Sequence, residues 1–151
     1  MTNIEALWAA VDVGPTRTLQ QDAEFGVLQI VDIALRAISP AVNDPSTAIN
    51  CIDQLSRIMI RWIGRDPPET YLSSPPHVVR VVVPWITTDE LLDTAFDQIR
   101  HYLVSDVAVS LRLLRALADI SICCADEALS AQLLERGQRI LDGARQVPCG
   151  R

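Results

Sequence analysis

The fold is decided by residues 22–53, which read DAEFGVLQIVDIALRAISPAVNDPSTAINCID. Apolar residues cover most of the circumference of a helix drawn over residues 22–38, so we expect this helix to be the most buried one. Asp44 is suited to cap a second helix, with Pro45 at its first position, where the missing N–H costs nothing. The stretch therefore predicts a central helix followed, after a short turn, by a second helix.

The remaining helices are predicted from capping residues and from apolar residues spaced three and four positions apart. They are a short helix before Gly14, a helix beginning near Thr87, a nearly all-apolar helix beginning at Ser105 or Asp106, and an amphipathic helix over residues 126–146. The residues expected to point inward from these helices include Tyr102, Leu134 and Leu141.

One strand is predicted. Residues 77–83 read HVVRVVV, a β-branched run bounded by Pro76 and Pro84. The loop before this run is too rich in proline for regular structure to be expected there. A lone strand leaves its backbone groups unpaired, so its partner is expected from the weak segments at 11–13 or 17–19, from another subunit, or from residues outside the chain.

These patterns predict a mainly α protein, a compact bundle of about five to six helices with one short strand at residues 77–83. A length of 151 residues with 49% hydrophobic residues suits one domain with a single core. We expect that domain to span residues 1–151, with an N-terminal helix and linker at 1–19 and the bundle core at 20–151.

Composition excludes several classes of function. The chain has 13 basic and 19 acidic residues without a cluster of cations, so we expect no nucleic-acid partner. Every basic residue is arginine, which excludes lysine Schiff-base chemistry and the lysine of a phosphate-binding loop. The four cysteines lack the spacing of zinc or redox sites, and no window is apolar enough for a membrane span.

The first candidate site is a small-molecule pocket beside the helix over residues 22–38. Its residues would be Gln29, Asp32, Arg36, Asn43 and Asp44. Asp32 and Arg36 are four positions apart, which is the spacing of an ion pair on a helix. The alternative that we favour is a buried ion pair that fixes how neighbouring helices dock.

The second candidate site is a metal site formed by Asp93, Asp97 and His101, which follow one another at intervals of four on one helix face. An aspartate and a histidine at this spacing can share a divalent cation. The set is incomplete, because a second acid and histidine pair is missing, and charged helix faces are usually just solvated. We therefore favour the solvated face and expect no cofactor.

Several segments together resemble one protein family. They are RTLQQD at 17–22, VDIALRA at 31–37, NDP at 43–45, VVP at 82–84, FDQIR at 96–100 and LRLLRAL at 111–117. This combination is similar to a bacterial family of predicted membrane proteins, the domain of unknown function 2254. The similarity covers most of the chain.

The resemblance implies more than the spacing does. Members of this family place membrane-spanning helices first and a soluble region last, and this chain resembles the last region. It would then be a truncated gene product or a freestanding copy, located in the cytoplasm or at the inner face of the cell membrane. Its expected partners are a second copy of itself or a membrane-spanning segment, which would also supply a neighbour for the strand.

The function that these observations favour is a non-catalytic helical module of a membrane-associated system, with a role in assembly, regulation or ligand sensing. The family provides no catalytic residues, and the sequence favours a non-enzyme. The first alternative is a metal-dependent, hydrolase-like enzyme that uses Asp93, Asp97 and His101. The second alternative is a small-molecule-binding domain built around Arg36.

Overall fold

The computed structural model describes residues 5, 9, 14, 16, 17, 22–102 and 106–146. Within these residues it is mainly helical, as predicted, with helices α2 (Ala23–Ile38), α3 (Pro45–Ile63), α4 (Thr88–Tyr102), α5 (Val107–Cys123) and α6 (Glu127–Gln146). Two short strands, β1 (Tyr71–Ser74) and β2 (Val78–Val82), lie between α3 and α4. The N-terminal helix predicted before Gly14 falls mostly outside the described residues.

Helix starts follow local capping chemistry, which the sequence predicted for α3, α4 and α5. Asp22, Asp44 and Asp106 cap α2, α3 and α5, each accepting a hydrogen bond from the backbone N–H three residues later. At the start of α4, Thr87 and Glu90 form a capping box, with the Glu90 carboxylate accepting from the Thr87 N–H at 2.8 Å. These starts are therefore set by residues within one turn of each helix.

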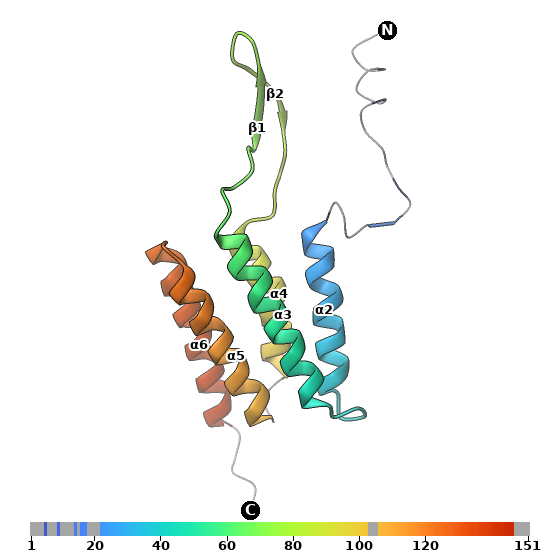
Figure 1. Ribbon diagram of the computed structural model, residues 1–151, viewed down its shortest axis with the longest axis vertical. Helices are drawn as coiled ribbons and strands as arrows, with labels where there is room; N and C mark the ends of the chain where they lie inside the picture. Colours follow the sequence, from blue (N-terminus) through green and yellow to red (C-terminus); the bar gives the residue numbers. More distant parts are fainter. Residues whose placement is uncertain are drawn as a thin grey trace, which may run out of the picture.

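The helices are arranged with α3 and α4 in the middle of the bundle (Figure 1). Helix α2 packs against α3 and α4 from one side, whereas α5 packs against α3 from the other side. Helix α6 packs against α5. The prediction that residues 22–38 form the central helix is therefore wrong. The polar stripe of Gln29, Asp32 and Arg36, together with the half-exposed Ile33, faces solvent and leaves α2 at an edge of the bundle.

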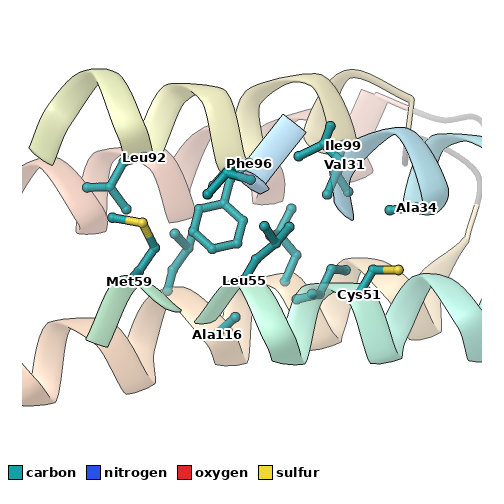
Figure 2. Close-up of a cluster of buried hydrophobic side chains, with 14 of the residues drawn as sticks. Val31, Ala34, Cys51, Leu55, Met59, Leu92, Phe96, Ile99 and Ala116 are labelled. Carbon is teal, nitrogen blue, oxygen red and sulfur yellow. The ribbon is translucent and has the colours of Figure 1, made fainter. Parts of the chain in front are cut away.

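The core is built around Phe96, which points from α4 between α2 and α3 (Figure 2). Its surroundings include Val31 from α2, Leu55 and Met59 from α3, and Ile99 from α4, all of them fully buried. Ala116 extends the cluster onto α5, and Leu133 and Ile140 bring α6 into the core. One contiguous apolar core therefore connects the five described helices.

Three residues that were expected to be buried lie at the surface. Tyr102 is 65% exposed at the end of α4, Leu134 is 70% exposed on α6, and Leu141 is 41% exposed on the same helix. The two α6 predictions are wrong because α6 packs on α5 through a narrow face, so Leu134 and Leu141 beside that face are left exposed. Tyr102 is the last residue of α4, beyond the buried part of that helix.

The strand element is a hairpin, not a lone strand. The predicted strand is present as β2, and its partner is β1, in the proline-rich segment that was expected to be irregular. The strands are antiparallel, with Tyr71 opposite Val82 and Ser74 opposite Val78, and the register shifts between Leu72 and Ser73. The expectation of a partner from elsewhere is therefore wrong for the edge of β2 that faces β1.

Candidate interaction site

The residues predicted for a ligand pocket lie along α2 and in the turn that connects it to α3. Gln29, Asp32 and Arg36 are exposed on α2, and the expected ion pair between Asp32 and Arg36 is not formed among the described residues. Asn43 adopts the left-handed turn conformation that its type favours, with φ 49. None of these three α2 side chains points into the core.

Asp44 has a structural role in this group. Its carboxylate accepts hydrogen bonds from the Thr47 N–H at 3.1 Å and from the Thr47 hydroxyl at 2.6 Å. The Thr47 hydroxyl and N–H lower the pKa of Asp44, because both stabilise its ionised form. The carboxylate is therefore occupied by the start of α3, and the ligand pocket stays a prediction.

The residues predicted for a metal site are each engaged with other side chains. The Asp93 carboxylate lies 2.5 Å from Arg136 Nη2 of α6, and the Asp97 carboxylate lies 3.5 Å from Arg100 Nε. The ring of His101 packs edge-on against Tyr102, with the ring centroids 5.5 Å apart. Within the described part of the chain, no group of three His, Cys, Asp or Glu residues is arranged to hold a metal ion.

Arg136 is the residue that sequence reasoning missed. It is only 8% exposed, and its Nη2 donates to Asp89 at 2.8 Å and to Asp93 at 2.5 Å. Burial opposes its charge, but these hydrogen bonds outweigh burial and raise the pKa of Arg136. The signal was present in the sequence, because Arg136 lies three residues after Leu133 and four before Ile140, on the inward face of α6.

A shallow pocket of about 100 Å³ opens where α4, α5 and α6 meet. Its lining includes Arg100, His101, Ser110 and Arg139. Both arginines are paired with carboxylates of their own helices, Arg100 with Asp97 and Arg139 with Glu135. The cationic lining is thus largely neutralised, and the pocket lacks the excess positive charge that would bind an anion.

The most unusual surface is the hairpin, which projects from one end of the bundle (Figure 1). Its large hydrophobic side chains are between 43% and 65% exposed; they are Tyr71, Leu72, Val78, Val79, Val81 and Val82. Monomeric soluble proteins rarely expose contiguous apolar patches of more than a few hundred Å². The exposed apolar side chains of the hairpin therefore make it a candidate interaction surface.

Apolar residues lie on both faces of this hairpin. The register places Val79 and Val82 on the face of Tyr71, whereas Val78 and Val81 share the face of Leu72. None of the described helices covers either face, since every residue of β2 is exposed. Among the described residues each strand pairs along one edge only, so in this part of the chain the outer edges of β1 and β2 present free backbone N–H and C=O groups.

The base of the hairpin is held by specific hydrogen bonds. The Trp85 indole N–H donates to the Glu69 carbonyl at 3.1 Å, and the Val83 N–H donates to the Thr70 carbonyl at 2.9 Å. The single charge on the strands, Arg80, donates from Nε to the Ser74 hydroxyl at 3.0 Å. An isolated two-stranded hairpin is marginal in water, so these contacts fix its position while its faces remain open.

Comparison with known proteins identifies the family. The family model described as "Predicted membrane protein (DUF2254)" matches residues 2–119, which include the hairpin and most of the bundle. The chain belongs to this family. The resemblance that was stated from the sequence is therefore confirmed, and DUF2254 defines a predicted membrane protein family without an assigned activity.

Relatives of this DUF2254 chain include uncharacterized proteins of Mycobacterium bovis and of two strains of Mycobacterium tuberculosis. Each is 37% identical over 116 residues, which is 77% of this chain and 22% of the relative. The chain thus spans about a fifth of the length of the curated relatives that it matches. No solved structure matches it. None of the helices that the structure describes has the length and apolarity to cross a bilayer.

Proposed function

We propose that this DUF2254 chain is a non-catalytic assembly module that docks onto a protein of the membrane through its β1–β2 hairpin. The observation that carries the proposal is the exposure of apolar side chains on both faces of the hairpin. A binding role explains why these side chains are not buried, whereas catalysis would require a cluster of reactive groups. The membrane setting comes from the family, whose printed description is a predicted membrane protein.

The chemistry of the hairpin favours a protein partner over lipid. Within the described structure the outer edges of β1 and β2 carry unpaired backbone groups, and hydrocarbon offers nothing to which these groups can hydrogen bond. A partner that contributes a strand, or a groove lined with polar backbone, satisfies these groups while it covers the valines. The occupant that fits is therefore a protein segment with apolar side chains and a free strand edge.

The metal-dependent enzyme and the small-molecule pocket remain alternatives. The engagement of Asp93 by Arg136 weighs against the enzyme, since a cation would have to displace a buried guanidinium. The use of Asp44 as a helix cap weighs against the pocket. Neither observation concerns the hairpin, which supports the assembly role independently.

The test is a co-sedimentation assay with membranes of the organism that encodes the chain. The double variant Val79→Thr with Val81→Thr keeps the β-branched shape of both residues but makes one position polar on each face of the hairpin. Val42→Thr is the matched control, because Val42 is 60% exposed in the turn between α2 and α3. We expect the wild-type chain and the Val42→Thr control to sediment with membranes. We expect the double variant to lose most of this membrane binding.

Protein-free lipid vesicles distinguish the two kinds of partner. We expect no sedimentation of the wild-type chain with vesicles that contain neutral and anionic lipids, and reduced sedimentation with protease-treated membranes. Equal binding to vesicles and to native membranes would replace the protein partner with lipid. Equal binding of the double variant and the wild type would refute docking through the hairpin.

A further inference from the structure

A second apolar surface lies on α5 and α6, away from the hairpin. Val107, Leu111 and Ile122 of α5 are 61% to 80% exposed, and they recur at helical spacing on one side of the helix, in line with the exposed Ala118. On α6, Leu134 and Leu141 lie seven residues apart and are also exposed. We call these residues the α5–α6 stripe.

The two halves of the stripe form one continuous surface. Leu114 of α5 lies next to Gly137 of α6, since a Cβ on Gly137 would be 3.8 Å from a Leu114 methyl carbon. On each helix the exposed stripe residues lie beside this contact. They are on the side that faces away from α4, because Arg136 points toward α4 from the other side of α6. The stripe therefore runs along the seam between α5 and α6, which are adjacent in Figure 1.

The charge around this surface suits a second copy of the chain. The exposed charges beside the stripe are paired within each helix, Arg115 with Asp119 on α5 and Arg145 with Asp142 on α6, whereas the whole chain has a net charge of -6. Two copies that approach through this region therefore avoid the repulsion that their other surfaces would produce. At the edge of the stripe, Arg115 and Asp119 form an exposed ion pair at 2.9 Å.

This pair is self-complementary. When two antiparallel α5 helices are related by a two-fold axis, the same side of each helix faces its counterpart in the other copy. Arg115 of one copy then comes within reach of Asp119 of the other. The family match also ends at residue 119, so α6 lies outside the matched residues. A partner shared by the whole family would not depend on α6, but a second copy of this chain always carries it.

We propose that the chain forms a two-fold symmetric homodimer through the α5–α6 stripe, with α5 and α6 of both copies packed as four helices. This interface leaves the hairpin free, and it does not depend on what the hairpin binds. Apolar side chains in the centre and paired charges at the rim are the arrangement of a stable helical interface.

The test compares two substitutions of the same type. Ile122→Glu puts a charge in the stripe, and Ile33→Glu is the matched control on α2, where Ile33 is 50% exposed. Light scattering coupled to size exclusion is expected to give a dimer for the wild type and Ile33→Glu and a monomer for Ile122→Glu. Circular dichroism establishes that each variant is folded, and Leu134→Glu provides a second disruption from the α6 side.

Three outcomes would overturn the proposal. The first is a wild-type chain that stays monomeric up to its highest soluble concentration. The second is a dimer that survives both Ile122→Glu and Leu134→Glu. The third is a dimer that dissociates only when Val79 and Val81 are changed to threonine, which would place self-association on the hairpin. If the hairpin double variant loses membrane binding but still forms the dimer, that result supports a dimer interface separate from the hairpin.

Discussion

Arg136 Nη2 of α6 lies 2.5 Å from the Asp93 carboxylate of α4, so this ion pair links two helices. The same nitrogen also contacts Asp89, one turn earlier on α4, at 2.8 Å. Both carboxylates are half exposed, whereas Arg136 is nearly buried. This cluster connects α6 to a helix with which it otherwise shares few contacts.

Arg136→Met should destabilise the protein by about 1 kcal/mol, because it removes charge-assisted hydrogen bonds whose acceptors are partly screened by solvent. Urea denaturation measures the change. Arg139→Met is the control, since the Arg139 pair with Glu135 lies on the surface of one helix and should contribute less than about 0.5 kcal/mol. Equal effects of the two substitutions would mean that the Arg136 cluster is not a structural link.

Zinc or manganese should leave the melting temperature of the wild-type chain unchanged, because Asp93 and Asp97 are already paired with arginines. Differential scanning fluorimetry with and without the metal checks this. A metal-dependent rise that disappears in both Asp97→Ala and His101→Ala would instead establish the metal site and revive the enzyme hypothesis.

Acid should destabilise the fold through its helix caps. The Arg17 guanidinium and the Phe25 N–H lower the pKa of Asp22, the Thr47 hydroxyl and N–H lower that of Asp44, and the Thr87 N–H and hydroxyl lower that of Glu90. Because each folded-state pKa lies below the unfolded one, the stabilisation is complete above the unfolded pKa and is lost as the pH falls through the folded pKa.

Melting temperatures measured between neutral pH and about pH 3 test this sign. Asp44→Asn should lower the melting temperature at neutral pH and flatten its decline in acid, since the variant has no carboxylate to protonate there. Asp66→Asn is the control, because Asp66 lies in an exposed loop. A decline in Asp44→Asn as steep as in the wild type would show that the cap is not the source of the pH dependence.

Phe96→Ala should cost about 3–5 kcal/mol, because Phe96 is 2% exposed and fills the space between α2, α3 and α4. Phe96→Leu should cost less, since it leaves a smaller cavity. Chemical denaturation of both variants gives the comparison, and a cost below about 1 kcal/mol for Phe96→Ala would contradict the position of the core.

The sequence predicted those parts of the fold that depend on neighbouring residues. The starts of α2, α3, α4 and α5 follow from Asp22, Asp44, the Thr87 and Glu90 box, and Asp106, each acting within one turn. The approximate positions of the five described helices were also predicted, because their apolar residues recur three and four positions apart. Local chemistry and periodicity determine these features, so no knowledge of the tertiary structure was needed.

The features that were predicted wrongly depend on how the helices pack against one another in the tertiary structure. Both α2 and α5 have apolar residues on most of their circumference, so periodicity did not reveal that α2 lies at an edge or that Leu111 and Ile122 face outward. Strand β1 was missed because its two serines and the prolines on either side of it concealed a short edge strand. Arg136 was missed because a charged residue on an inward face needs a partner from a distant helix.

The candidate site was the least predictable part for the same reason. The sequence singled out the valine-rich run of β2 and its need for a partner, but not that β1 would satisfy one edge and leave both faces exposed. Only the position of the hairpin beyond the bundle shows that these valines have no intramolecular cover in the described structure.

Hydrogen–deuterium exchange of the hairpin amides is the most direct test of docking through β1 and β2. In the isolated chain, the amides of residues 71–82 should exchange quickly compared with those of α3, because the hairpin is covered on neither face. Addition of native membranes should slow exchange in the hairpin while exchange in α3 stays unchanged. Unchanged hairpin exchange in a sample that has sedimented with membranes would contradict the proposed docking role.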